Sequence, residues 1–200
     1  MNLADKLTLF RIILAPVFFV IYLSHRLFPS LFDNGAQTHA GWIIPTLWVI
    51  FLVSEITDYF DGFAARKLNQ VSDFGKLFDP FADTLVQITC FLCFIIDGIF
   101  PVWAAILFLL VIYREFGILF IRNLMLKKGV ALGASIYGKI KTVVYIIAVG
   151  AALLAASLER LTVYESLLPY FKTGALVIFV ISVVFAVVSF FDYLIKYKKT

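Results

Sequence analysis

The amino-acid sequence predicts an all-α integral membrane protein with six transmembrane helices and both termini in the cytoplasm. Three features predict it: an apolar composition, six apolar segments of bilayer-spanning length, and a one-sided distribution of the cations. Of the 200 residues, 62% are hydrophobic and 15% are charged, whereas soluble domains usually have about 45–50% apolar and 25% charged residues. A chain this short cannot bury so much apolar surface within itself, so lipid must cover the rest.

Six apolar segments account for most of the chain. Each is close to the roughly 20 residues that a helix needs to cross the hydrocarbon core. Strands of a membrane barrel would alternate apolar and polar residues over about 10 positions, so helices are favoured. The connections contain no low-complexity linker, and we expect one membrane domain over residues 1–200. The segments are 8–27, 41–60, 79–99, 102–123, 140–158 and 168–194.

The cations give the orientation of these segments. With the N-terminus in the cytoplasm, 13 of the 17 Lys and Arg residues fall on the cytoplasmic side. Only Arg26, Arg160 and Lys172 fall on the other side, and Arg114 lies within the fourth segment. This is the bias expected of loops that stay in the cytoplasm. The net charge of +4 is therefore attributed to membrane orientation, and no nucleic-acid partner is expected.

The two cysteines, Cys90 and Cys93, form a C-x-x-C pattern inside the apolar stretch 85–96. Redox or metal chemistry needs a thiolate, and apolar surroundings suppress its formation. We therefore expect two packed small residues rather than a redox or metal site, and no disulfide framework.

Four aspartates form the strongest candidate site. Asp58 and Asp61 are three residues apart at the end of the second segment, and Asp79 and Asp83 are four apart at the start of the third. Residues three or four apart share a face of a helix. A short cytoplasmic connection makes the two helices antiparallel neighbours, so we expect the two pairs to converge near the membrane surface.

Four ionised carboxylates that converge repel one another unless cations bind between them. Hard oxygen ligands suit Mg²⁺ or Mn²⁺, and two such ions about 3.5–4 Å apart can clamp a diphosphate. The alternative is that these aspartates cap helices or face solvent, which is common for a single aspartate. Two same-face pairs beside one short connection favour a site for two divalent cations, with Glu55 as a supporting group outside both pairs.

The same region contains a longer motif, D-x-x-D-G-x-x-A-R, then eight residues, then G-x-x-x-D-x-x-x-D. It resembles the signature of the CDP-alcohol phosphatidyltransferases. The resemblance implies a six-helix enzyme, often a homodimer, and we expect it in the bacterial inner membrane with its active site facing the cytoplasm. Every fixed position is matched, by Asp58, Asp61, Gly62, Ala65, Arg66, Gly75, Asp79 and Asp83.

The resemblance also implies roles for single residues. Asp58, Asp61 and Asp79 are expected to bind the metal ions, and Asp83 to bind them and to act as the general base. The acceptor oxygen, once Asp83 takes its proton, attacks the β-phosphorus of CDP-diacylglycerol, and CMP leaves. The N-terminal segment reads Asp5-Lys6-Leu7-Thr8 where the family usually has an Asn-x-Leu-Thr run. Contacts to the CDP-lipid are implied for Gly62, Arg66, Ser72, Thr8 and Arg11.

Four later cations point to the acceptor. Arg114 and Arg122 are eight residues apart, near the same helical face, and Lys139 and Lys141 begin the fifth segment. An intramembrane Arg is costly without a partner, and Glu115 is the candidate. The set resembles the phosphatidylglycerophosphate synthases in its R-E, later Arg and G-K-x-K-T. That resemblance implies sn-glycerol 3-phosphate as acceptor, with its phosphate on the four cations and its 1-hydroxyl attacking.

Other interpretations stay open from the residues alone. The later cations could serve topology only, and the acceptor could be inositol phosphate, phosphatidylglycerol or serine. An acceptor without phosphate would leave the four cations without a ligand. A cation transporter would also place carboxylates in a membrane. It would not explain Gly62, Ala65 and Arg66 at fixed positions, nor a site at a helix end rather than at the midplane. The segment 25–41 is interpreted as an external loop without an assigned role.

Overall fold

The computed structural model describes residues 3–29, 36–67, 73–129 and 136–199. The side chains of 3, 4, 36–40, 59–67, 73–80, 126 and 199 lie outside this description. The described parts form helices joined by turns and contain no strand, as the all-α prediction requires. The helices are α1 (Leu3–Tyr22), α2 (Ser24–Leu27), α3 (Ala36–Lys67), α4 (Asp73–Ile96), α5 (Ala104–Lys127), α6 (Ile136–Arg160) and α7 (Leu168–Lys199).

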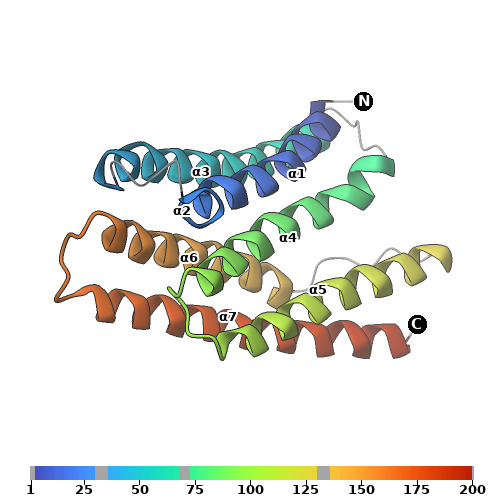
Figure 1. The fold of residues 1–200 in the computed structure, drawn as a ribbon. Coiled ribbons are helices and arrows are strands. Elements are labelled where there is room, and N and C mark those ends of the chain that lie inside the picture. The colour runs from blue at the N-terminus through green and yellow to red at the C-terminus, as the bar shows by residue number, and fades with distance from the viewer. Residues whose placement is uncertain (1–2, 30–35, 68–72, 130–135, 200) are drawn as a thin grey trace.

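The long helices lie lengthwise against one another in a bundle (Figure 1). α1 packs against α3 and α4, α6 packs against α7, and α5 packs against α7. α1, α4 and α6 begin at the end of the bundle where α3, α5 and α7 finish (Figure 1). Such an up-and-down order follows from short connections between consecutive helices, and it brings the facing ends of α3 and α4 together.

Among the described residues, four helical segments are long and apolar enough to cross a membrane. They correspond to four of the six predicted segments. The predicted segment 79–99 corresponds to the shorter apolar stretch Phe81–Ile96, and the segment 8–27 is divided between α1 and α2. An α-helical membrane protein is thus supported, whereas six crossings stay a prediction. The four segments are Gly41–Asp58, Ala104–Met125, Ile136–Arg160 and Leu168–Lys198.

Helices α3 and α4 extend further than their apolar segments. α3 continues to Lys67 and α4 begins at Asp73, so most of the predicted connection 61–79 is helical. Hydropathy marks where the lipid-covered part ends, but a helix satisfies its own backbone groups and can continue into water. Both aspartate pairs therefore lie on helices, and Pro80 lies inside α4 rather than at its start.

The core combines small residues with aromatic rings. Ala148 and Ala152 of α6 and Ala175 of α7 are buried, and small residues let helix backbones approach closely in a membrane. The ring of Phe179 lies 4.7 Å from that of Phe91 and 5.0 Å from that of Phe100, between ring centroids. Aromatic packing thereby joins α4, α7 and the α4–α5 connection.

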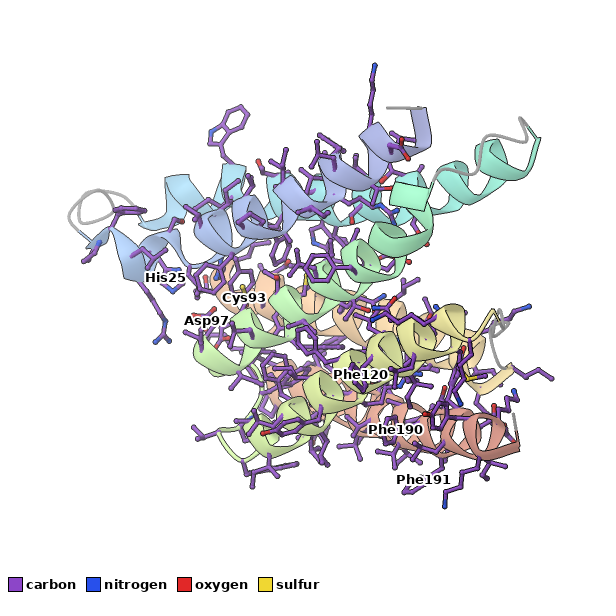
Figure 2. The ribbon with its side chains drawn as sticks, turned by 90° about the vertical axis from the view of Figure 1, so that its right-hand side faces the viewer. His25, Cys93, Asp97, Phe120, Phe190 and Phe191 are labelled. Carbon is purple, nitrogen blue, oxygen red and sulfur yellow. The ribbon has the colours of Figure 1, made fainter. Side chains whose placement is uncertain are left out.

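Two further sequence predictions concern residues inside and outside this core. Cys90 and Cys93 are buried free thiols, in agreement with the prediction of packed small residues. Large apolar side chains on the outer faces are exposed, among them Phe120 at 65% and Phe191 at 58% (Figure 2). Water does not favour so many exposed rings, so these faces are suited to lipid.

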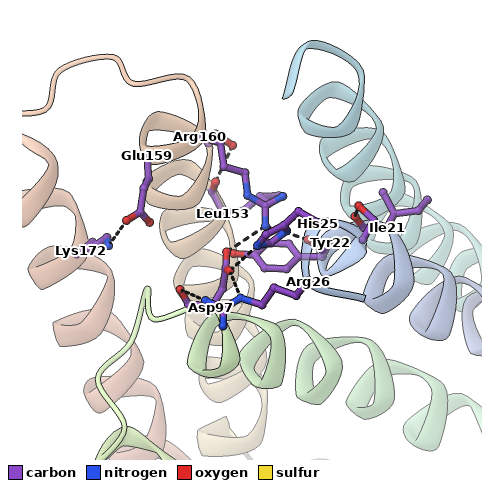
Figure 3. A network of polar contacts seen from close by, with 11 residues as sticks. Ile21, Tyr22, His25, Arg26, Asp97, Leu153, Glu159, Arg160 and Lys172 are labelled. Carbon is purple, nitrogen blue, oxygen red and sulfur yellow. Dashed lines mark hydrogen bonds and ion pairs between the residues drawn. The ribbon is translucent and has the colours of Figure 1, made fainter. Parts of the chain in front are cut away.

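A network of ion pairs ties the helices together at the end of the bundle away from the aspartates. Asp97, directly after α4, accepts hydrogen bonds from Arg160 Nη2 at 3.0 Å and Arg26 Nε at 3.1 Å, and its Oδ1 lies 3.1 Å from His25 Nε2 (Figure 3). Arg160 also donates to the backbone oxygen of Tyr22 at 2.9 Å. His25 and Arg26, placed in an external loop by the sequence, thus lie on the short helix α2 and join α1, α4 and α6.

The protonation of Asp97 couples this network to pH. Burial acts to raise the pKa of Asp97, but the hydrogen bond and charge of Arg160, together with His25 and Arg26, outweigh burial and hold the pKa below its ordinary value of 3.8. A carboxyl with a lowered folded pKa stabilises the fold fully above its unfolded pKa. That contribution is lost as pH falls through the lowered pKa.

Asp97→Asn is expected to reduce the free energy of unfolding at pH 7 by on the order of 2 kcal/mol, because the hydrogen bonds then lose their charged acceptor. Thermal unfolding in detergent measures it. The difference from the wild type should shrink as the pH is lowered below 3.8. Asp192→Asn is the control, because its ion pair with Lys196 lies on the surface of α7. Equal stability of Asp97→Asn and the wild type at pH 7 would contradict the role of the network.

Candidate active site

Two of the four predicted aspartates are brought to one cation. Arg11 of α1 donates from Nη1 to Asp58 Oδ1 of α3 at 2.5 Å and to Asp83 Oδ1 of α4. Arg11 is buried at 1% exposure, whereas the two carboxylates remain partly exposed. One member of each aspartate pair therefore faces the same point, at the end of the bundle where α3 finishes and α4 begins (Figure 1).

A small cavity opens beside these carboxylates. Besides Arg11, Asp58 and Asp83, its lining includes Glu55, which the sequence suggested as a supporting group. Thr8, predicted to contact the CDP-lipid, is fully buried one turn before Arg11. The other lining residues are Ser54, Val86, Gln87 and Thr142.

Several predicted site residues fall outside the described side chains. Asp61, Gly62 and Arg66 lie on the last turns of α3, and Asp79 lies on α4, but only their backbone is described. Ser72 lies outside the described residues altogether. Their predicted roles stay predictions.

The described carboxylates fit a cation site in donor type. Within the described residues, no group of three or more His, Cys, Asp or Glu side chains is arranged to hold a metal ion. The predicted ligand set, however, includes Asp61 and Asp79, whose side chains are not described. Asp58 and Asp83 present oxygen atoms to a single positive group, and oxygen is the donor that Mg²⁺ and Mn²⁺ prefer.

A second cavity of about 280 Å³ adjoins the first. Asp83, Gln87 and Thr142 line both cavities. The second cavity lies between α4, α5, α6 and α7, and all four cations predicted to bind the acceptor phosphate are in its wall. These cations are Arg114, Arg122, Lys139 and Lys141.

Glu115 holds two of the four cations. Arg114 Nη1 donates to both Glu115 carboxylate oxygens at 2.8 Å, and Lys141 Nζ donates to Oε1 at 2.8 Å. Arg114 also donates to Ser189 Oγ at 2.7 Å and to the backbone oxygen of Ala186 at 3.2 Å. The predicted partnership of Arg114 with Glu115 is confirmed, and α7, which no local pattern indicated, completes it.

The other two cations are held less firmly. Arg122 Nη2 donates to the hydroxyl of Tyr193 at 3.1 Å, with its guanidinium 5.6 Å from the centroid of that ring. Lys139 is exposed at the mouth of the cavity. These two side chains keep more freedom to meet an incoming anion than Arg114 and Lys141.

Sequence reasoning missed three polar residues in the wall of the larger cavity. Tyr193 lies in an apolar helix and has no motif around it, so no sequence signal marks it, whereas Gln87 follows Asp83 by one helical turn. Thr84 directly follows Asp83, and its hydroxyl donates to Glu115 Oε2 at 3.4 Å. Its position next to a motif residue is the one signal that could have singled it out.

The two cavities together can perform a particular kind of chemistry. A carboxylate that borders both cavities, Asp83, can accept a proton from a hydroxyl held between them. The cations of the larger cavity can bind an anionic group of the same molecule. The arrangement therefore suits a small alcohol that also carries a phosphate.

Comparison with known proteins identifies the family. A model of the CDP-alcohol phosphatidyltransferase family matches residues 1–188. The chain is 36% identical to "CDP-diacylglycerol--glycerol-3-phosphate 3-phosphatidyltransferase" of Treponema pallidum (strain Nichols) over 199 residues, or 97% of this chain and 88% of that protein.

Two further relatives cover less of the chain. The protein of the same name from Bacillus subtilis (strain 168) is 37% identical over 76% of this chain and 77% of its own length. A "Probable phosphatidylglycerophosphate synthase" of Mycobacterium tuberculosis (strain ATCC 25618 / H37Rv) is 33% identical over 78% and 68%. With the family model covering nearly the whole chain, and Asp58 and Asp83 of the motif meeting beside a cationic cavity, this chain belongs to the CDP-alcohol phosphatidyltransferase family.

Proposed function

We propose that this chain transfers the phosphatidyl group of CDP-diacylglycerol to the 1-hydroxyl of sn-glycerol 3-phosphate, with release of CMP and formation of phosphatidylglycerophosphate. The observation that carries the proposal is the cavity of about 280 Å³ that places Asp83 and four cations around one space. The names of the relatives from Treponema pallidum and Bacillus subtilis support the same acceptor.

The reaction needs one proton transfer and one displacement. Asp83 accepts the proton of the 1-hydroxyl, and the freed oxygen attacks the β-phosphorus of the CDP-lipid. The bond from that phosphorus to the oxygen it shares with the α-phosphate breaks, and CMP leaves with the electron pair. Divalent cations, Mg²⁺ or Mn²⁺, held by Asp58, Asp61, Asp79 and Asp83, would neutralise the diphosphate and the charge on the departing CMP.

The acceptor phosphate is assigned to the larger cavity. Arg114 and Lys141 share the single negative charge of Glu115, so this group keeps a net positive charge of one. Arg122 and Lys139 add two more positive charges to the wall. A phosphate dianion is attracted by this excess, whereas serine, with no phosphate, would leave it uncompensated.

The CDP-lipid is assigned to the opposite side of Asp83. Gly62, Arg66, Ser72, Thr8 and Arg11 are proposed to contact it on the strength of the family motif. Arg11 already lies between Asp58 and Asp83, next to the place proposed for the diphosphate.

The proposal includes six membrane crossings, by α1 and by α3 to α7, with both termini and the site facing the cytoplasm of a bacterial cell. The one-sided distribution of the cations supports this orientation. So does the grouping of the helix ends, because α1 begins and α7 finishes at the end where the aspartates lie (Figure 1). The proposal also includes a homodimer, which is supported by the family resemblance.

Purified protein in detergent, given CDP-diacylglycerol, Mg²⁺ and sn-glycerol 3-phosphate, should release CMP and form phosphatidylglycerophosphate in equal amounts. Chelation of the divalent cation should stop both, and Mg²⁺ or Mn²⁺ should restore them. Serine or inositol phosphate in place of sn-glycerol 3-phosphate should give little product. Product with either of these at the same rate would assign a different acceptor.

Asp83→Asn is expected to lower the rate of CMP release at least about 100-fold, because a positioned general base contributes this much or more. Its thermal unfolding should stay close to that of the wild type. Asp192→Asn, the same substitution on the surface of α7, should keep full activity. Wild-type turnover by Asp83→Asn would show that another group takes the proton.

Arg122→Gln is expected to raise KM for sn-glycerol 3-phosphate about tenfold or more, because a hydrogen bond to a charged group contributes about 1.5–3 kcal/mol. KM for CDP-diacylglycerol should change little. Lys127→Gln, an exposed cation of α5 outside the cavity wall, is the matched control. A rise in KM for the CDP-lipid alone would move Arg122 to the donor side.

Glu115→Ala is expected to destabilise the protein by about 3–5 kcal/mol, because two buried cations then lose their counter-charge. The unfolding temperature in detergent should fall by roughly 10 °C. Glu165→Ala, an exposed acid between α6 and α7, should leave it unchanged. An unaltered unfolding temperature for Glu115→Ala would show that this carboxylate does not hold the helices together.

A further inference from the structure

Gln87 is a buried polar residue whose side chain has no hydrogen-bond partner among the residues that the structure describes. It lies on α4 at 5% exposure, and no hydrogen bond joins its amide to any residue that the structure describes. It lines both the aspartate cavity and the cationic cavity. Its amide atoms are not among the enclosed polar atoms left without a partner, so they open onto the cavities, where a ligand can complete their hydrogen bonds.

The chemistry of an amide limits what could satisfy it. A glutamine side chain carries an acceptor oxygen and a donor NH₂, so it is well matched to a hydroxyl, which also donates and accepts. A phosphate would bind the cations Arg122 and Lys139 in preference, and a divalent cation would bind the carboxylates. The ligand group that Gln87 would bind is therefore an uncharged polar group.

The other neutral polar side chains described in the wall of the larger cavity already have partners. Thr84 donates to Glu115, and Thr142 donates to the backbone oxygen of Gly138 at 3.2 Å. Tyr193 accepts from Arg122. In the described wall of the larger cavity, the Gln87 amide is thus the group left to recognise a hydroxyl.

The position of Gln87 indicates which hydroxyl this is. Gln87 follows Asp83 by four residues, so the two side chains share a face of α4 one turn, about 6 Å, apart. When one hydroxyl of the acceptor gives its proton to Asp83, the hydroxyl on the adjacent carbon lies within reach of the Gln87 side chain, one turn further along α4. The phosphate at the far end of such a molecule then extends toward the cations.

We infer that Gln87 is a specificity-determining residue, which hydrogen-bonds the acceptor hydroxyl adjacent to the one that attacks. The inference rests on the proposed function and deepens it, since it assigns the middle hydroxyl of sn-glycerol 3-phosphate. An acceptor without that hydroxyl leaves the buried amide unsatisfied, and a site built for a hydroxyl rejects such an analogue strongly.

The test compares two acceptors in the wild type and in Gln87→Met, which keeps the length of the side chain but not its polar atoms. The second acceptor is 3-hydroxypropyl phosphate, with the same primary hydroxyl and phosphate but no middle hydroxyl. The wild type should prefer sn-glycerol 3-phosphate about tenfold or more in kcat/KM. Gln87→Met should lose most of this preference, through a lower kcat/KM for sn-glycerol 3-phosphate alone.

Activity with 3-hydroxypropyl phosphate shows that the variant is folded and competent, and Gln87→Leu provides a second variant if Gln87→Met is unstable. Thr89→Val is the matched control, because Thr89 is on the same helix, bonds the backbone oxygen of Leu85 and lines neither cavity. It should keep the wild-type preference.

Three outcomes would overturn the inference: a wild type indifferent to the middle hydroxyl, an equal loss with both acceptors, or a change confined to KM for CDP-diacylglycerol. Each of these leaves the proposed function standing if the wild type releases CMP with sn-glycerol 3-phosphate. Absence of that release in the wild type would instead end the proposed function.

Discussion

A buried charge in a lipid-covered bundle must find its counter-charge inside the protein, and this constraint organises the larger cavity. Glu115 meets it by accepting from Arg114 and Lys141, both at 6% exposure. Because Arg114 also bonds Ser189 and the backbone of Ala186, the charged cluster joins α5, α6 and α7. The cost of leaving any of these groups unpaired in such surroundings keeps the three helices in register around the cavity.

This arrangement gives the four cations two different tasks, because two of them form the wall of the cavity and two stand near its mouth. Arg114 and Lys141 are held by a carboxylate and form a fixed wall, whereas Arg122 and Lys139 stand closer to the mouth. Asp83 borders both cavities and is thereby placed between a cationic space and an anionic one. A molecule with a phosphate at one end and a hydroxyl at the other would bridge these spaces, and this geometry links the fold to the proposed reaction.

The opposite end of the bundle shows the same constraint at a smaller scale. Asp97 forms ion pairs with Arg26 and Arg160, and the guanidinium of Arg160 lies 4.3 Å from the centroid of the Tyr22 ring. Arg26 and Arg160, two of the three cations that the sequence places on the non-cytoplasmic side, therefore connect α1, α4 and α6. The helices are fastened by ion pairs at both ends, with aromatic and small residues between them.

The sequence by itself determined the helical class, four candidate membrane spans and the family, because length, hydropathy and motif spacing are properties of the local chain. Asp58 and Asp83 could be paired from their positions on two adjacent helices, and Glu115 from its place next to Arg114. Gln87, Ser189 and Tyr193 could not be placed in this way. α7 is apolar on nearly every face and carries little sign of which face turns inward, and the polar face of α4 does not show which helices pack against it. Only the packing of α4 and α7 against their neighbours decides that, and it depends on side chains far apart in the chain.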